Sequence, residues 1–138
     1  MFSIGGIFIP VTNLKKSIEW YEENLELQRI SDWEDGIGFC LSSGSTQLAL
    51  VKVESTQSTE FIIEGSKKNS YYNFFVDDIG IAHAKLSNKG VKTSEIKDYD
   101  GMKCFDFFDL DNNLFSVVSE DPDSPFHPDH IKKLQMKD

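Results

Sequence analysis

Two histidines and an aspartate stand close together near the end of the chain, in the segment His127-Pro128-Asp129-His130. Imidazole nitrogens and carboxylate oxygens are common ligands of zinc and other transition metals, so this spacing is able to hold a metal ion. A metal site also needs a rigid frame, and this segment lies in a proline-bearing tail. We therefore predict a solvated tail at 121–138, with a short helical segment at 131–136, rather than a metal site.

The other side chains able to do chemistry are isolated along the sequence. His83 falls in a predicted helix, where a half-buried packing role is expected more often than a catalytic one. Cys40 and Cys104 are the only cysteines, and they form no C-x-x-C or other metal-binding spacing. Because secretory features are absent, we expect two reduced core thiols and a cytoplasmic protein. The acidic segment 109–113 is predicted to be a turn, with Asn112 in the left-handed conformation.

The elements that must position these residues occur twice in the sequence. Residues 6–14 read GIFIPVTNL, and residues 71–79 read YYNFFVDDI. In each copy an extended apolar run ends at Thr12-Asn13 or Asp77-Asp78, whose side-chain oxygens can cap the start of a helix. A repeat of this length is too long for a solenoid and indicates two copies of one supersecondary module.

Hydrophobic periodicity predicts the same order in both copies, a strand, a helix and three further strands. Module one, at about 4–53, has strands at 6–11, 27–33, 37–41 and 46–53 and a helix at 14–25. Module two, at about 71–120, has strands at 71–76, 91–96, 102–108 and 114–118 and a helix that Gly90 ends. The polar segment 54–70 is predicted to be a linker. We expect one domain over residues 1–120, followed by the tail.

Strand parity and helical spacing together predict the hydrophobic core. Alternate side chains of a strand face opposite sides of a sheet, and helix residues three or four apart share a face. The predicted core residues are Ile9, Val11, Ile18, Tyr21, Leu50, Phe74, Val76, Leu86, Phe107 and Val117.

Two stretches resemble the vicinal oxygen chelate superfamily, which includes glyoxalase I, extradiol dioxygenases, fosfomycin-resistance enzymes and bleomycin-resistance proteins. They are IFIPVTNLxxSIxWYxxNL at 7–25 and FDFFDLDNNLF at 105–115, and the resemblance extends over residues 4–120. It implies an α+β fold in which two βαβββ modules form curved mixed sheets around a cavity. It does not specify an activity, because this superfamily uses one scaffold for many reactions.

The resemblance also implies where a metal would be bound. The ligand positions of the glyoxalase pattern correspond to Gly6, Ala49, Tyr71 and Ser116 in this sequence. None of them is His or Glu, and neutral hydroxyls are weak ligands for a divalent ion. We therefore predict no metal at these positions and no cofactor.

The same strand parity defines a candidate ligand-binding face around the cavity that the resemblance implies. Its residues are Phe8, Gln47, Tyr71, Asn73, Phe75 and Ser116, and Asp106 is expected to join them. Apolar walls with a few hydrogen-bonding groups are typical of small-molecule pockets. The alternative is that the polar members simply face water in an open sheet. An ionised Asp106 would favour a cationic or hydrogen-bond-donating ligand.

The charge balance limits the partners. The chain has 14 Lys and Arg against 23 Asp and Glu, a formal net charge of -9. An acidic chain without a basic patch is a poor partner for nucleic acid or anionic membranes. Paired modules of this family commonly assemble as dimers, so we expect a homodimer. The sequence does not decide whether the cavity lies within one chain or between two.

Three functions remain open on sequence alone. The first is a metal-free protein that binds and sequesters a small organic or cationic compound, in the manner of the bleomycin-resistance proteins. The second is a lyase, isomerase or dioxygenase of the same superfamily with a non-standard or absent metal site. The third is a regulatory module that binds a protein through its acidic surface or its tail. The missing metal ligands and the acidic charge favour the first.

Overall fold

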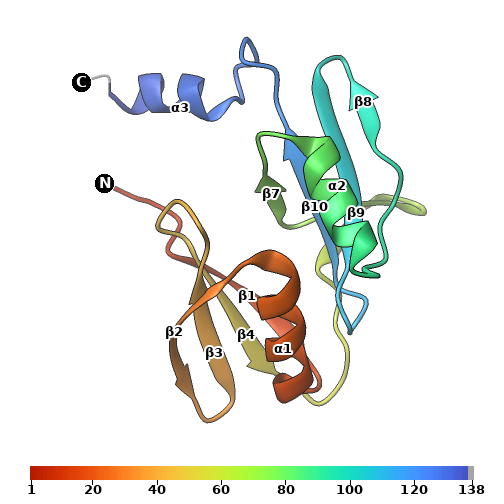
Figure 1. Cartoon of the computed structure of the whole chain (residues 1–138). Coiled ribbons are helices and arrows are strands. Elements are labelled where there is room, and N and C mark those ends of the chain that lie inside the picture. Colours follow the sequence, from red (N-terminus) through yellow and green to blue (C-terminus); the bar gives the residue numbers. More distant parts are fainter. Residues whose placement is uncertain (137–138) are drawn as a thin grey trace. The chain divides into compact units, whose positions relative to one another are not determined.

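The computed structural model describes residues 1–136 and consists of two compact units (Figure 1). Unit 1 contains Met1–Thr59 together with the short segment Asp109–Asn113. Unit 2 contains Glu60–Phe108 and the described residues from Leu114 onward. Each unit contains one four-stranded mixed sheet and one helix that packs on that sheet.

Unit 1 has the predicted βαβββ order. Its elements are β1 (Gly6–Val11), α1 (Leu14–Leu25), β2 (Gln28–Trp33), β3 (Gly36–Cys40) and β4 (Gln47–Lys52). The strand order is β1-β4-β3-β2, with β1 parallel to β4 and the other pairs antiparallel. The parallel pair is possible because α1 makes the crossover that parallel strands need, and α1 then packs against β4.

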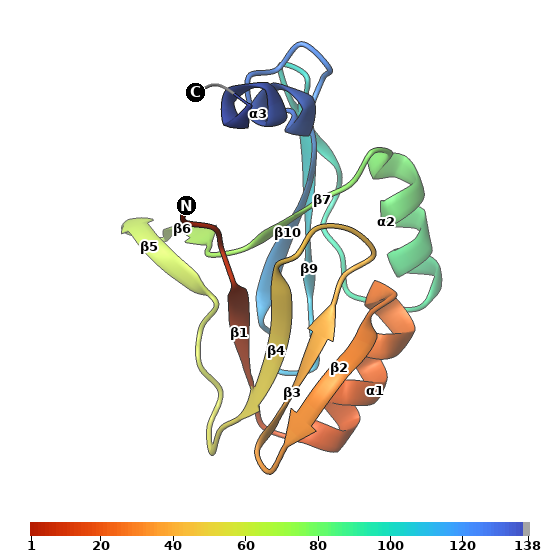
Figure 2. The same cartoon turned by 90° about the vertical axis from the view of Figure 1, so that its left-hand side faces the viewer.

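Unit 2 repeats this topology and confirms the duplication. Its elements are β7 (Asn73–Phe75), α2 (Ile79–Asn88), β8 (Lys97–Tyr99), β9 (Met102–Phe108) and β10 (Leu114–Ser119). The strand order is β7-β10-β9-β8, with β7 parallel to β10, and α2 packs on β9 and β10. Figure 2 shows each helix beside the sheet of its own module. The α+β fold class with two βαβββ modules is therefore confirmed.

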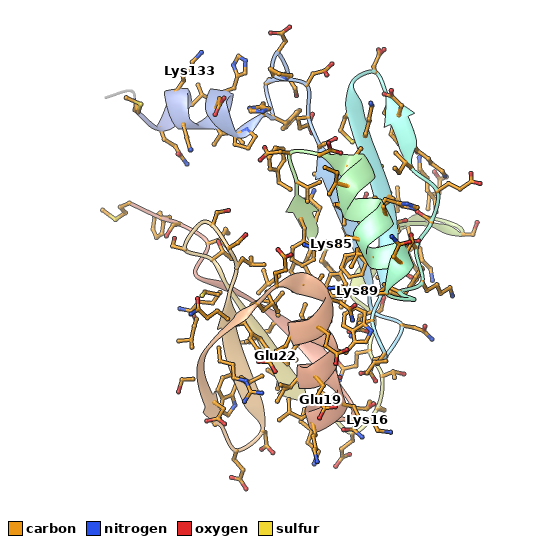
Figure 3. All side chains as sticks on the ribbon, viewed as in Figure 1. Lys16, Glu19, Glu22, Lys85, Lys89 and Lys133 are labelled. Atoms are coloured by element: carbon orange, nitrogen blue, oxygen red, sulfur yellow. The ribbon has the colours of Figure 1, made fainter. Side chains whose placement is uncertain are left out.

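Helices α1 and α2 begin at the predicted capping residues, Asn13 and Asp78. The side chain of Asn13 accepts a hydrogen bond from the Lys16 N–H at 3.1 Å, and the side chain of Asp78 accepts one from the Ile81 N–H at 3.0 Å. Each bond satisfies one of the N–H groups that a helix start leaves free. Charged residues of α1 such as Lys16 and Glu19, labelled in Figure 3, are exposed, which leaves Tyr21 to face the core.

The core follows the predicted parity. Seven of the ten predicted core residues are buried, and Ile18, Phe74 and Val76 are half-buried. Phe74 lies with the core side chains, because its ring is 6.0 Å from Phe107 and 5.7 Å from Phe115. Asn73 is exposed, as the strand register requires.

The polar segment 54–70, predicted as a linker, contains a β-hairpin. Its strands are β5 (Glu60–Glu64) and β6 (Lys67–Ser70), joined at Gly65, which has a φ of +57°. The hairpin forms because the apolar trio Phe61-Ile62-Ile63 supplies a strand and a glycine supplies the turn. The linker prediction was wrong because it was based on the polar composition of 54–70 and gave no weight to the apolar trio or to the glycine.

The strand predicted at 91–96 is also wrong, because the edge strand of unit 2 is β8 and 91–96 contributes only an isolated bridge from Thr93. The Val91 N–H bonds back to the Leu86 carbonyl at 3.1 Å and the Gly90 N–H to the Ser87 carbonyl at 3.0 Å. This is the bonding of a Schellman helix end, in which the residue after the glycine packs against the helix. Val91 is accordingly buried and is not available to a sheet.

The last helix is longer than predicted and starts earlier. Helix α3 spans Pro128–Gln135, with His127 as its N-cap and Pro128 in its first turn. A proline is favourable there because the first helical N–H has no partner in any case. In both views α3 extends away from the sheet of unit 2 (Figures 1 and 2). Among the helices of residues 1–136, none is both long enough and apolar enough to cross a membrane.

Candidate ligand-binding face

Three of the predicted ligand-binding residues form one row across the sheet of unit 2. Ser116 on β10 is in register with Asn73 on β7 on one side and with Asp106 on β9 on the other. Asp106 lies between Phe105 and Phe107, which are buried on the side that α2 covers, and the His83 ring is 4.9 Å from Phe105. The row therefore lies on the sheet face opposite α2.

Hydrogen bonds connect this row to the hairpin. The Ser116 hydroxyl donates to Asp106 Oδ1 at 2.8 Å, and Ser70 Oγ is 2.9 Å from Ser116 Oγ. The Ser70 hydroxyl also donates to the Tyr72 carbonyl at 3.2 Å, so it links Ser116 to the backbone beside Tyr71. The Asp106 N–H donates to the Ser94 hydroxyl at 2.8 Å, which fixes the backbone behind the carboxylate.

Asp106 affects the titration of Cys104, which lies on the same face of β9. The pKa of the Cys104 thiol is raised, first by burial and then by the repulsion between a thiolate and Asp106. Cys104 is therefore a thiol near neutral pH and a poor nucleophile or metal ligand. Cys40 and Cys104 are both free, but both are half-buried, so the prediction that they are core residues is wrong; Cys104 shares the face of Asp106 and not that of the buried Phe105 and Phe107.

Aromatic rings border the row. The Tyr71 ring is 5.3 Å from Phe61, and the Phe75 ring meets His127 edge-on at 5.8 Å. Phe61 and His127 were not among the predicted site residues, and neither was Ser70. All three lie in the segments that were predicted to be a linker and a tail. Predicting a hairpin at 60–70 would have placed Phe61 and Ser70 beside the sheet.

The two remaining predicted residues, Phe8 and Gln47, lie in unit 1. Phe8 on β1 is in register with Ala49 on β4, and Gln47 precedes Ala49 by two residues, so Phe8 and Gln47 share a sheet face. Both are exposed. The structure thus brings five of the predicted residues together in unit 2 and two in unit 1.

The residues at the family's metal positions do not fit a metal ion. Gly6 and Ala49 have no donor atom in their side chains. Tyr71 packs its ring on Phe61, and the Ser116 hydroxyl is already bonded to Asp106. Within residues 1–136, moreover, no three His, Cys, Asp or Glu side chains are grouped so that they could hold an ion.

A second polar cluster is fully buried and lies in unit 1. Asp109 accepts four hydrogen bonds, from the Tyr21 hydroxyl at 2.5 Å, the Asn113 side chain at 2.8 Å, and the backbone N–H groups of Asp111 and Asn113, both at 2.9 Å. Asn113 also donates to the Pro10 carbonyl at 2.9 Å. The turn at 109–113 is as predicted, and Asn112 has a φ of +61°. The buried network around it was not predicted.

Burial sets the protonation of this cluster. Burial raises the pKa of the Asp109 carboxyl, and the bonds from Tyr21 and Asn113 act in the opposite direction. Burial, followed by the charge of Asp109, raises the pKa of the Tyr21 phenol well above its usual range, so the phenol stays a donor. With four donors on one carboxylate and no open face, this cluster holds the turn against α1 and β1 and is structural.

Two clefts are formed by other residues. One, of about 680 Å³ in unit 1, lies at the start of α1 and is lined by charged side chains that include Lys15, Arg29 and Lys52. The other, of about 320 Å³ in unit 2, is lined by residues that include Asp77 and Asp121. Arg29 in the first cleft is paired with Glu22 at 2.8 Å, which lowers the pKa of Glu22 and raises that of Arg29.

Comparisons with solved structures agree with this architecture. The structure is similar to TnmS3, an antibiotic binding protein from Streptomyces sp. CB03234, with a TM-score of 0.69, 17% identity and coverage of 88% of this chain and 98% of that one. It is also similar to the fosfomycin resistance protein FosX from Listeria monocytogenes, with a TM-score of 0.69, 14% identity and coverage of 88% and 96%. A glyoxalase family protein from Enterococcus faecalis gives a TM-score of 0.66, 21% identity and coverage of 84% and 96%. At these identities the likeness shows the fold.

A family model covers most of the sequence. No match was found among curated proteins. Residues 3–117, however, match the model of the Glyoxalase/Bleomycin resistance protein/Dioxygenase superfamily, and this range contains both βαβββ modules. The chain therefore belongs to the Glyoxalase/Bleomycin resistance protein/Dioxygenase superfamily.

Proposed function

We propose that this protein binds a small organic cation on the sheet face of unit 2 opposite α2, without a metal at the family's position. The observation that carries the proposal is the position of Asp106. Its carboxylate is held by Ser116 on a half-buried face whose borders are aromatic rings. A carboxylate in such surroundings accepts a charge-assisted hydrogen bond from a ligand ammonium group, while the rings contact the apolar body of the ligand.

The role of each residue follows from its place in the row. Asp106 receives the charged group of the ligand, and Ser116 fixes the carboxylate. Asn73, exposed in the same row, offers both a donor and an acceptor to a second polar group. Tyr71 and Phe75 contact the apolar part of the ligand. Phe8 and Gln47, which share a face of the sheet of unit 1, are proposed as ligand contacts of that unit.

Binding without conversion is the simplest use of this set of groups. Acid–base catalysis usually needs a general base together with a partner acid, a nucleophile or a metal, and Asp106 is the one acidic or basic side chain in the row of Asn73, Ser116 and Asp106. The similar solved structures include an antibiotic binding protein and a fosfomycin resistance protein, which supports a role in sequestering a small compound. We further propose that the two modules act as one domain, in a cytoplasmic homodimer.

A fragment titration tests the binding proposal. Aromatic amines that are cationic at neutral pH, and neutral alcohols of matched shape, are titrated while backbone NMR signals are followed. Amines are expected to shift signals of β7, β9 and β10, and the alcohols are expected to bind at least about tenfold more weakly. Asp106→Asn should remove this preference for amines. Asn73→Leu should weaken binding of both classes.

The proposal fails if the amines shift other parts of the chain, or if Asp106→Asn and Asn73→Leu leave their binding unchanged. Metal content is a separate test. After chelation and dialysis, elemental analysis is expected to show no stoichiometric divalent metal. An ion held at Ser116 and Asp106 would replace the binding proposal with a metal-assisted enzyme.

A further inference from the structure

A histidine nitrogen caps the start of helix α3. Nδ1 of His127 accepts a hydrogen bond from the Asp129 N–H at 3.1 Å, whereas α1 and α2 are capped by the side-chain oxygens of Asn13 and Asp78. An imidazole nitrogen accepts only while it carries no proton, so the proton of the neutral ring is on Nε2. The cap of α3 therefore depends on the charge of one side chain.

Little packing supports helix α3. It is eight residues long, and none of its residues is buried. Helices shorter than about 12 residues are marginal in water, and packing supplies most helical stability in proteins. The His127 ring meets the Phe75 ring edge-on at 5.8 Å and so joins the start of α3 to β7. The same side chain thus caps the helix and connects it to the sheet of unit 2.

Protonation of His127 removes this cap. The charged ring has a hydrogen on each nitrogen, so Nδ1 no longer accepts from the Asp129 N–H. A cation at a helix start is also repelled by the positive end of the helix dipole. Histidine is the side chain that ordinarily changes charge between pH 5 and pH 8. Acidification over this range therefore acts against the folded start of α3.

Asp129 offers the charged ring a second partner. Its Oδ2 is 3.8 Å from His127 Nδ1, which is too far for a hydrogen bond but close enough to attract an imidazolium. When neutral, Nδ1 accepts from the Asp129 N–H, and when charged it is drawn to the Asp129 carboxylate. One nitrogen cannot do both, so the helix start has two alternative bonds, and the charge of the ring selects between them.

The other neighbours of the ring do not compete for it. Phe75, which the ring meets on β7, is uncharged. The acidic residues of the turn before α3 are Glu120, Asp121 and Asp123. Glu120 accepts from the Ser124 hydroxyl at 2.9 Å, and within residues 1–136 Asp129 is the carboxylate that pairs with His127. His130, the second histidine of this helix start, bonds to the His127 carbonyl through its backbone N–H at 2.9 Å.

We infer that His127 is a pH-sensitive cap, which holds α3 against Phe75 when it is neutral and releases α3 when it is protonated. As regulation of the ligand-binding face, this inference rests on the proposed function, because Phe75 is one of the rings proposed to contact the ligand. Release of His127 removes the ring that borders Phe75. A contact that is no longer held in place costs more to order on binding, so acid weakens ligand binding.

The test follows α3 of the full chain by NMR between pH 8 and pH 5. The Cα chemical shifts of residues 129–135 measure its helix population, and the imidazole nitrogen shifts identify the tautomer of His127. At pH 8 the ring is expected to be the Nε2–H tautomer. Acidification is expected to lower the ratio of folded to unfolded α3 about fivefold, the usual effect of losing one cap, with the midpoint at which His127 itself titrates.

Three variants separate His127 from its neighbours. His127→Asn keeps a cap that does not titrate, so α3 is expected to stay helical over the whole range. His130→Gln is the matched control and is expected to retain the wild-type transition. Asp129→Asn is expected to move the midpoint to lower pH, because the charged ring loses its second partner. A constant helix population in the wild type, an equal transition in His127→Asn, or a transition abolished by His130→Gln overturns the inference.

A ligand titration separates this inference from the proposed function. The wild type is expected to bind an aromatic amine, cationic over the whole range, about threefold more weakly at pH 5.5 than at pH 8. His127→Asn is expected to bind it equally at both values. Equal weakening of both proteins, or of neither, overturns the regulatory role. If no amine binds at either pH, the proposed function fails, while the chemical shifts of α3 still decide whether His127 is a pH-sensitive cap.

Discussion

Replacement of Tyr21 by Phe tests whether the buried carboxylate of Asp109 is charged and held by its donors. The change removes only the hydroxyl that donates to Asp109 Oδ2 at 2.5 Å. Asp109 keeps the bond from the Asn113 side chain and two backbone N–H bonds. The ring of Phe fills the same space in the core, where Tyr21 is fully buried, so no cavity is made.

The expected loss is about 2 kcal/mol in the free energy of unfolding. Hydrogen bonds to charged groups contribute roughly 1.5–3 kcal/mol, and the three remaining bonds keep the value away from the upper end. Because urea slopes of small proteins are about 1–3 kcal/mol per molar, the unfolding midpoint should fall by about 1 M. Tyr99→Phe is the control. Its side chain is exposed, and its effect should stay within about 0.5 kcal/mol.

The pH dependence identifies the charge. Burial raises the pKa of Asp109 in the folded state, so the folded chain binds a proton before the unfolded chain does. Stability from this group is therefore present at low pH, and it falls as pH rises from the ordinary pKa of an aspartate through the raised pKa. The Tyr21 bond opposes that rise, so Tyr21→Phe raises the pKa of Asp109 further.

The loss in Tyr21→Phe should consequently be largest at neutral pH and smaller in acid, where Asp109 is protonated in both proteins. Urea titrations at several pH values measure this difference. A loss that is the same at every pH, or no loss at all, would contradict the view that the hydroxyl stabilises a buried carboxylate.

Three further stability changes follow from the fold. Phe74→Ala should cost about 3 kcal/mol in denaturation experiments, because it removes the ring that packs on Phe107 from a half-buried site; a loss below 1 kcal/mol would show that the ring is not part of the core. Asp78→Ala should cost about 1 kcal/mol by removing the cap of α2, and Asp78→Asn should restore most of it. Gly90→Ala should cost about 1 kcal/mol because its φ is +82°, although no atom blocks the new methyl group; Gly5→Ala, equally open and without a positive φ, should be neutral.

The parts of the fold that sequence predicted correctly depend on neighbours in the chain. A strand alternates with period two, so the exposure of Asn73 and the packing of Phe74 follow from one register. Asn13 and Asp78 cap helices through N–H groups three residues away. Patterns that involve residues two to four positions apart can be read from the sequence without knowing the tertiary contacts.

The errors have a different cause. The hairpin at 60–70 is built from polar residues with a short apolar centre, and Ser70 bonds to Ser116, which is 46 positions away. Valine is a residue type that favours strands, but the Val91 N–H donates to the Leu86 carbonyl at the end of α2. In each case a hydrogen bond to a residue outside the local pattern determined the structure, and composition does not show with which partner a backbone or hydroxyl group will bond.

The candidate site shows the same limit more sharply, because Asp106 and Asp109 lie three residues apart and have opposite roles. Asp109 is buried beneath four donors, the Tyr21 hydroxyl coming from 88 positions away. It has no capacity left for a ligand. Asp106 is half-buried, and Ser116 is the one residue within 1–136 that donates to its carboxylate. Strand parity predicted the face of Asp106, and the local sequence predicted a turn at Asp109, but the number of donors around each carboxylate is what separates a structural group from a group that can bind a ligand. The proposed function therefore depends on the acceptor capacity that Asp106 keeps for a ligand, and substituting Asp109 should destabilise the protein without changing which ligands it prefers.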